Sequence, residues 1–251
     1  MSSPIAGPTA PHPTLKTYYE RDGERECFVS ALFDGAAEHY DWVCRLMALG
    51  SGQAYRRRAL LRSGLGRGMR LLDIATGTGL VARSAIHMLG RPGVVIGLDA
   101  SRGMLQQALK AFPIPLVQGR AEALPFRSDF FDVASMGYAL RHMADLAAAF
   151  RECLRVLKPG GRLLILEISR PRSPVSLWAI RVYFQKILPA ITRIGTKSAY
   201  AELLTKYYWD TIRMCVPPET ILEVLQQSGF VAVERRVFGG LFSEYAGKKP
   251  S

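Results

Sequence analysis

The chain of 251 residues contains no run of eighteen or more uncharged apolar residues, so no segment is expected to cross a bilayer as a helix. Its four cysteines lie far apart and no two have C-x-x-C spacing, which excludes a disulfide framework and a zinc site. They are Cys27, Cys44, Cys153 and Cys215. Residues 1–16 are rich in Pro, Ser, Thr and Ala and lack the apolar core of a signal peptide. We therefore expect a cytoplasmic protein whose residues 1–20 form a disordered tail.

Motifs for nucleic acid and for phosphate are also missing. The sequence shows no metal knuckle, no aromatic RNA-stacking motif and no helix-turn-helix pattern, so a nucleic-acid partner is not expected. One glycine turn is present, but no lysine follows it, which excludes a P-loop. The dinucleotide spacing G-x-G-x-x-G is not met either, because Ala75 stands where a first glycine would lie.

That turn is the most informative feature that is present. An apolar strand runs into Asp73, then into Gly77-Thr78-Gly79, then into a helical pattern. About twenty residues later a second apolar run ends in Asp99, where a carboxylate can accept both hydroxyls of a ribose. The glycines alone would also fit a structural turn. Together with Asp73 and Asp99 they favour a cationic nucleoside without phosphate, which is S-adenosylmethionine (SAM), and they predict no metal.

The net charge of +12 points to an anionic surface as partner, although a solubilising surface would explain it equally well. One strongly apolar segment, Val175 to Ile191, carries three aromatic residues and is interrupted only by Arg181 and Lys186. This pattern is typical of an interfacial helix and equally of a cap helix packed on the core. Peripheral contact with the inner face of a membrane is therefore one expectation, and a homodimer remains open.

Apolar strand patterns alternate with amphipathic helical ones through the middle of the chain, which predicts an α/β fold with a doubly wound, mostly parallel sheet. Two helices are expected before the sheet, at Ser30–Leu49 and Gln53–Arg62, and two short strands at its end, Phe230–Val237 and Leu241–Ala246. Lys158-Pro159-Gly160-Gly161 is expected to end a helix. The central strands are predicted at Arg70–Ile74, Val94–Asp99, Ile114–Gln118, Phe131–Met136 and Arg162–Ile168; the helices between them at Leu80–Leu89, Gly103–Ala111 and Ala144–Leu157.

An ordered set of motifs resembles the ubiquinone/menaquinone biosynthesis C-methyltransferases (UbiE-type), within the class I SAM-dependent methyltransferases. The resemblance covers about Phe33 to Ala246. Its motifs are Leu32-Phe33-Asp34, Leu72-Asp73-Ile74-Ala75-Thr76-Gly77-Thr78-Gly79, Gly97-Leu98-Asp99, Ala121-Glu122-Ala123-Leu124-Pro125-Phe126, Ala139-Leu140-Arg141, Arg155 to Glu167, and Ile212-Arg213-Met214.

The resemblance implies a seven-stranded sheet in a single domain over residues 21–251, with N-terminal helices and a helical cap at about 172–215. It implies that Thr78 and its glycines hold the methionyl end of SAM and that Asp99 holds the ribose. Arg120 and Ala121 would flank the adenine, and Gly137 would border the methionine part and the substrate pocket. Arg120 departs from the Asn or Asp usual in the family, because arginine has no acceptor.

Three departures concern the substrate side. His142 replaces the family's asparagine after Arg141; it would act as a general base or a metal ligand, or be held in place by backbone hydrogen bonds. Aromatic residues at Tyr207–Trp209 replace a Y-R-Y-L-x-E-S pattern and would pack a planar substrate or form cap core. Leu80 stands where the family has an acid.

These features predict SAM-dependent modification, first of all methyl transfer, of a prenylated quinone or a similar lipophilic aromatic. Arg141 would stabilise the phenolate of the substrate or orient a water that removes its proton. The alternatives are a non-methylating change such as the introduction of the amino group of rhodoquinone, O- or N-methylation of a small aromatic metabolite, and a scaffold without catalysis.

Overall fold

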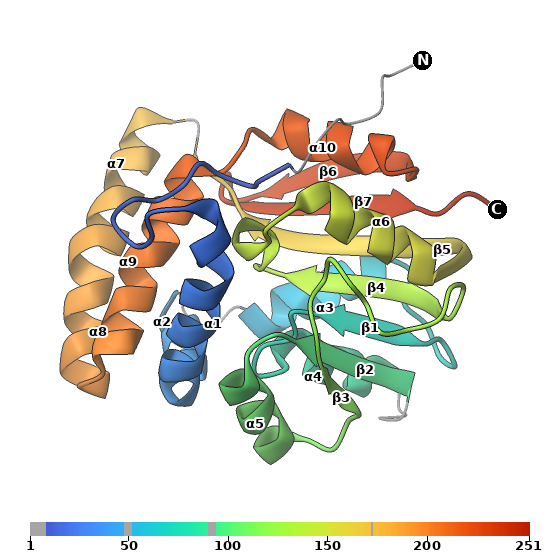
Figure 1. Ribbon diagram of the computed structural model, residues 1–251, viewed down its shortest axis with the longest axis horizontal. Helices are drawn as coiled ribbons and strands as arrows, with labels where there is room; N and C mark the ends of the chain where they lie inside the picture. The colour runs from blue at the N-terminus through green and yellow to red at the C-terminus, as the bar shows by residue number, and fades with distance from the viewer. Residues whose placement is uncertain (1–8, 48–51, 90–93, 172) are drawn as a thin grey trace.

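A seven-stranded sheet in the order β3-β2-β1-β4-β5-β7-β6 forms the centre of the protein (Figure 1). The computed structural model describes residues 9–47, 52–89, 94–171 and 173–251. All strands run parallel except β7, which is antiparallel to both of its neighbours. The strands are β1 (Leu71–Ile74), β2 (Val95–Asp99), β3 (Leu116–Gln118), β4 (Phe131–Gly137), β5 (Leu157–Ile168), β6 (Val231–Phe238) and β7 (Phe242–Lys248).

The order of the strands reverses at β1, which pairs with β2 on one side and with β4 on the other. The central strands are buried on both faces, as expected from near-continuous apolar runs. Helices α3 and α4 pack on one face, and α6 and α10 on the other. The helices around the sheet are α3 (Gly52–Arg62), α4 (Leu80–Leu89), α5 (Arg102–Ala111), α6 (Leu146–Val156) and α10 (Pro218–Gln227), with the short 3-10 turn η4 (Leu140–His142) after β4.

Two apolar cores fill the space between the sheet and the helices on its two faces. A third apolar core lies beyond the carboxyl-terminal edge of the sheet (Figure 1). It joins the N-terminal helices to a helical cap, Pro174–Met214, in which α9 packs against both α1 and α8. The N-terminal elements are η1 (Asp22–Glu24), α1 (Arg25–Ala36), η2 (Ala37–His39) and α2 (Tyr40–Met47); the cap consists of α7 (Pro174–Val182), the π-helical turn η5 (Tyr183–Ile187), α8 (Leu188–Thr196) and α9 (Ala199–Met214).

The seven expected strands and the doubly wound sheet are confirmed. Most boundaries agree within about two residues, and two regions differ more. The helix expected over Ser30–Leu49 is divided by η2, because one 3-10 turn changes the hydrogen bonding without ending the apolar pattern; residues 48 and 49 lie outside the described residues. Helix α6 ends at Val156, and Lys158-Pro159-Gly160-Gly161, expected to end a helix, lies inside β5. The strand begins at Leu157, which pairs with Phe131 before a register shift.

The segment from Thr9 to Glu20 is not the disordered tail that its composition suggested, while residues 1–8 lie outside the described residues. The backbone N–H of Thr9 donates to Asp145 Oδ1 at 3.0 Å. The side chains of Leu15 and Tyr19 are buried in the third core. The polar residues between them dominate the average composition, so the spaced apolar anchors were missed.

No helix of the described residues is long and apolar enough to span a bilayer.

If this segment is part of the core, Leu15→Ala should lower the free energy of unfolding by about 2–4 kcal/mol, because it removes buried methyl groups and leaves a cavity. Urea denaturation measures the change. Lys16→Ala, at the exposed neighbouring position, is the control and should change stability little. Equal stability of both variants would show that the segment contributes nothing to the core.

Candidate functional site

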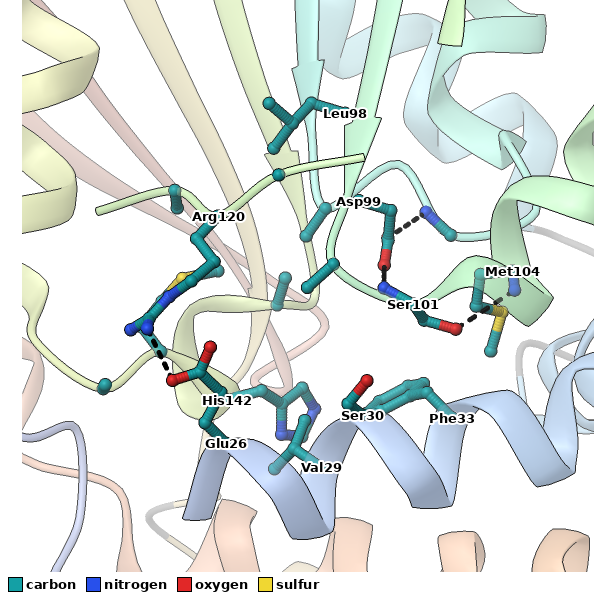
Figure 2. Close-up of a pocket in the computed structure, with 18 of the residues that line it drawn as sticks. Glu26, Val29, Ser30, Phe33, Leu98, Asp99, Ser101, Met104, Arg120 and His142 are labelled. Atoms are coloured by element: carbon teal, nitrogen blue, oxygen red, sulfur yellow. Dashed lines mark hydrogen bonds and ion pairs between the residues drawn. The ribbon is translucent and has the colours of Figure 1, made fainter. Parts of the chain in front are cut away.

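A cleft opens at the carboxyl ends of β1, β2 and β4, where the strand order reverses, and α1 covers it (Figure 2). This is the position at which open parallel sheets bind their ligands. The sheet contributes Gly77, Asp99 and Gly137 to the wall. Helix α1 contributes Glu26 and Phe33 from the opposite side. The cleft thus has a polar floor made by the strand ends and a partly apolar roof.

The two glycines of the turn after β1 serve different purposes. Gly77 has a φ of +58° and lines the cleft, so a ligand can approach its backbone closely. Gly79 also has a positive φ, but a Cβ there would lie 1.9 Å from the Phe112 ring. Gly79 therefore allows the start of α4 to pack against Phe112, and it does not line the cleft.

Asp99 stands on the floor of the cleft at the end of β2. Its Oδ2 accepts from the backbone N–H of Gly77 at 2.7 Å, and its Oδ1 accepts from that of Ser101 at 2.8 Å. Burial raises its pKa to about 6, although both backbone donors oppose the rise. Each carboxylate oxygen keeps a lone pair, because two oxygens offer about four acceptor sites. The structure thus places Asp99 where the sequence predicted it and holds it in one orientation.

Asp73 and Thr78, which the sequence predicts as cofactor-binding residues, do not line the cleft. Asp73 is buried and accepts from Thr76 Oγ1 at 2.7 Å, from Ser135 Oγ at 2.7 Å and from the backbone N–H of Ala82 at 3.1 Å. The hydroxyl of Thr78 donates to Asp41 of α2. Both side chains therefore shape the turn from behind, which its spacing alone did not reveal.

Arg120 and Ala121, which the resemblance predicts beside the adenine, also line the cleft. The guanidinium of Arg120 forms an ion pair with Glu26 of α1 and lies 3.6 Å from a carboxylate oxygen of Glu122 (Figure 2). Arginine in place of an acceptor residue thus links the loop after β3 to the helix above it. Sequence reasoning missed Glu26, because nothing near it in the chain marks it as a partner of Arg120.

A second, more apolar cavity adjoins the cleft under the cap, and the two share one wall. That wall consists of Tyr40, Ala75, Gly137 and Tyr138. Ala75 and Tyr138 have φ values of +51° and +62°, a region that costs non-glycine residues about 1–3 kcal/mol and is found mostly at functional sites. We call this second cavity the cap chamber.

The cap chamber contains two buried arginines, Arg141 and Arg56. Arg141, predicted as catalytic, forms a buried ion pair with Glu167, a residue that the sequence did not single out. Arg56 has no carboxylate of the described residues within ion-pair distance, and its Nε lacks a hydrogen-bond partner there. Burial raises the pKa of Tyr138, and the positive charge of Arg56 opposes that rise. The uncompensated cation of the chamber is thus Arg56, while the charge of Arg141 is neutralised.

His142 lines the cleft, with its ring stacked on Tyr207 and Tyr208 at centroid distances of 5.4 and 5.9 Å. Neither ring nitrogen has a hydrogen-bond partner among the described residues, so no backbone bond holds it. Burial, and then the charge of Arg141, keep its pKa well below the ordinary value. The neutral ring can exchange hydrogen bonds with a ligand, but it binds a proton poorly near neutral pH. The described residues contain no group of three or more His, Cys, Asp or Glu side chains able to hold a metal ion.

The other departures from the family divide between chamber and core. Leu80 and Tyr208 line the cap chamber, so both can contact a substrate. Tyr207 and Trp209 are buried in the third core instead. One face of α9 thus supplies a single ring to the chamber, and the neighbouring rings hold the cap in place.

Comparisons with known proteins give a consistent result. The sequence model of the ubiE/COQ5 methyltransferase family matches residues 20–249. The ubiquinone/menaquinone biosynthesis C-methyltransferase UbiE of Hahella chejuensis is 36% identical over 213 residues, covering 82% of this chain and 84% of that protein. A demethylmenaquinone methyltransferase of Lactococcus lactis is 33% identical over 84% of this chain and 85% of that protein.

Solved structures share the fold at low sequence identity. A SAM-dependent methyltransferase of Thermotoga maritima superposes with a TM-score of 0.61 at 19% identity, over 88% of this chain and 99% of that one. Phosphoethanolamine N-methyltransferase 2 of Haemonchus contortus, solved with S-adenosyl-L-methionine, gives 0.58 at 20% identity, over 79% of this chain and 53% of that one. The sheet described above is thus the class I methyltransferase fold.

Asp99→Asn should weaken SAM binding by about tenfold to a hundredfold, because hydrogen bonds to a charged group contribute about 1.5–3 kcal/mol. In the unchanged protein the affinity should be full above pH 6 and decline as the pH falls through 6, where Asp99 takes up a proton. Calorimetry with SAM between pH 5 and 8 measures both effects. Because the pKa of Asp73 is also raised to about 6, the pH dependence left in Asp99→Asn gives the contribution of Asp73. An unchanged affinity in Asp99→Asn would exclude the ribose role.

Proposed function

This chain belongs to the ubiE/COQ5 methyltransferase family and is a SAM-dependent enzyme, and from this we propose that it methylates a ring carbon of a lipophilic quinol in quinone biosynthesis. The printed activities of its relatives support the reaction, since they are a ubiquinone/menaquinone biosynthesis C-methyltransferase and a demethylmenaquinone methyltransferase. Its own residues support the class of substrate.

The observation that carries the proposal is the shared wall between the two cavities. The cleft has the polar floor that a nucleoside requires, and the cap chamber is lined mainly by apolar and aromatic side chains such as Leu80, Ile180 and Phe184. Gly137 lines both cavities. A side chain is not accommodated there, because a Cβ would lie 2.8 Å from a side-chain carbon of Val81. An apolar aromatic substrate in the chamber would thus lie next to a cofactor in the cleft, and such positioning is a large part of catalysis of group transfer.

The residues of the cleft fit SAM. Asp99 would accept hydrogen bonds from the ribose, the turn at Gly77 leaves room for close backbone approach, and Arg120 with Ala121 would border the base. Asp73 and Thr78 would hold the shape of that turn without touching the cofactor. When bound, SAM supplies a methyl group carried on a sulfonium.

The side chains of the protein must make the ring carbon of the quinol nucleophilic. A quinol ring becomes electron-rich when its phenolic hydroxyl loses the proton, and a nearby cation stabilises the phenolate that results. Arg56 lies in the cap chamber without a carboxylate partner among the described residues, so its full charge is available. Arg141 is held by Glu167 and would contribute mainly orientation and hydrogen bonds. We therefore assign phenolate stabilisation to Arg56, where sequence reasoning assigned it to Arg141.

Mass spectrometry of the quinone pool in cells with and without the gene tests the function. Ring C-methylation predicts that deletion causes a quinone lighter by one methyl group to accumulate and that reintroduction of the gene removes it. Loss of an aminoquinone would instead indicate the rhodoquinone type of reaction. An unchanged quinone pool would contradict both and favour a small aromatic substrate.

Arg56→Met should lower kcat by about 100-fold, the usual loss when one stabilising group of a developing oxyanion is removed. SAM affinity should not change, because Arg56 lies in the chamber and not in the cleft. The matched control is Arg57→Met, at the next, exposed position of the same helix, and it should keep full activity. Full turnover of Arg56→Met with a quinol substrate would exclude the assignment.

A further inference from the structure

Exposed apolar side chains gather on the outer face of the cap. Of the ten large apolar residues that are exposed among the described residues, six belong to the stretch from Val175 to Tyr200. Trp178 is 65% exposed and Ile194 is 78% exposed. The six are Val175, Trp178, Ile187, Ile191, Ile194 and Tyr200. Tyr200 begins α9 and packs over Gly35 of α1, so the outer face is formed by the other five. Single exposed apolar residues need no explanation, but a cluster on one face marks an interaction surface.

Positive charge accompanies this apolar surface. Arg181 of α7, Lys186 of η5 and Lys197 at the end of α8 are exposed. Arg193 of α8 is also exposed, and its guanidinium lies 3.9 Å from the carboxylate of Glu202. The sequence from residue 168 to residue 201 contains no Asp or Glu. The outer face of α7, η5 and α8 therefore combines exposed apolar side chains with charged side chains that are all basic. We call it the cap face.

The helices keep this face continuous. The π-helical turn at Tyr183–Ile187 inserts an extra residue between α7 and α8. That insertion rotates α8 relative to α7, so that Ile187, Ile191 and Ile194 continue the exposed row begun by Val175 and Trp178. In Figure 1 the two helices form the outermost layer of the molecule, beyond α9 and away from the sheet.

The inner side of the same helices lines the cap chamber. Ala179, Ile180, Tyr183 and Phe184 belong to its wall. Only the thickness of these helices thus separates the exposed cap face from the cavity in which we place the substrate.

We infer that the cap face binds the surface of a bilayer that contains anionic phospholipid. Aromatic and aliphatic side chains on one side of a helix, flanked by Arg and Lys, suit the boundary between headgroups and acyl chains. Each basic residue near an anionic surface adds electrostatic attraction. Trp178 would lie at the headgroup level, and Arg181 and Lys186 would contact lipid phosphates. The cap chamber would then lie directly behind the helices that contact lipid, close to the source of a lipophilic quinol; this last point rests on the proposed function, and the binding itself does not.

Charge favours lipid over a second copy of the chain. A two-fold dimer through the cap face would place the face against itself. Its arginines and lysines would then meet their own copies, with no acid between residues 168 and 201 to neutralise them. Phospholipid headgroups provide the missing negative charge.

Sedimentation of the full chain with vesicles tests the inference without SAM or quinol. The protein should bind vesicles of phosphatidylglycerol and phosphatidylcholine at least tenfold more tightly than vesicles of phosphatidylcholine alone, and high salt should weaken the binding. Trp178→Ser with Ile194→Ser, and separately Arg181→Glu with Lys186→Glu, should each reduce it at least tenfold. The matched controls are Leu61→Ser with Leu109→Ser and Arg57→Glu with Arg58→Glu, which change exposed residues elsewhere and should bind as before.

The fluorescence of Trp178 provides a second measurement. Trp42 is partly buried next to Gly195 of α8, so the measurement uses a Trp42→Phe background. Vesicles should shift its emission to shorter wavelength, and the further change Trp178→Phe should abolish that shift, since the remaining Trp209 is buried in the core. Absence of binding to anionic vesicles, or equal losses in the controls, would overturn the inference. A dimer in light scattering that Trp178→Ser converts to a monomer would assign the face to a second copy instead. Vesicle binding by a protein that methylates no quinol would leave this inference standing and contradict only the proposed function.

Discussion

The buried carboxylate of Asp73 holds together the part of the fold on which the rest depends. It accepts hydrogen bonds from the turn after β1, from the start of α4 and from β4, so three segments meet on one side chain at the point where the strand order reverses. Burial raises its pKa to about 6, although its three hydrogen-bond donors oppose the rise. Since the turn shaped by this network carries Gly77, Asp73 supports the cleft without lining it.

Two cavities of different chemistry follow from this arrangement. The strand ends provide Asp99, whose carboxylate two backbone N–H groups hold in place and which suits the hydroxyls of a polar nucleoside. The cap covers the same edge with apolar helices, which suit an aromatic substrate. Ala75 and Tyr138, both in left-handed conformations, lie in the wall between them. Strain is thus concentrated where the two ligands would meet, as it is at many functional sites.

Local patterns were sufficient for the frame and for part of the site. Apolar runs of strand length and helical periodicity depend on neighbours in sequence, so the strands and the helices between them could be predicted, and Asp99 could be placed at the tip of β2. The pairing of Arg120 with Glu26 and of Arg141 with Glu167 could not, because each joins segments that only the folded chain brings together. The burial of Leu15 and Tyr19 escaped prediction for the same reason.

From the order of its residues alone, this chain could be assigned a mostly parallel sheet, SAM as its cofactor and membership of the UbiE-type methyltransferase family, since these rest on short motifs and their spacing. Which residues line the cleft depended on the folded chain, as the contrast between Gly77 and Thr78 shows. Only in the folded chain is the charge of Arg141 neutralised by Glu167, while Arg56 has no carboxylate partner among the described residues. The exposure of one face of the cap is likewise a property of the folded chain. Charge compensation and exposure depend on neighbours in space, and no local pattern of residues encodes them.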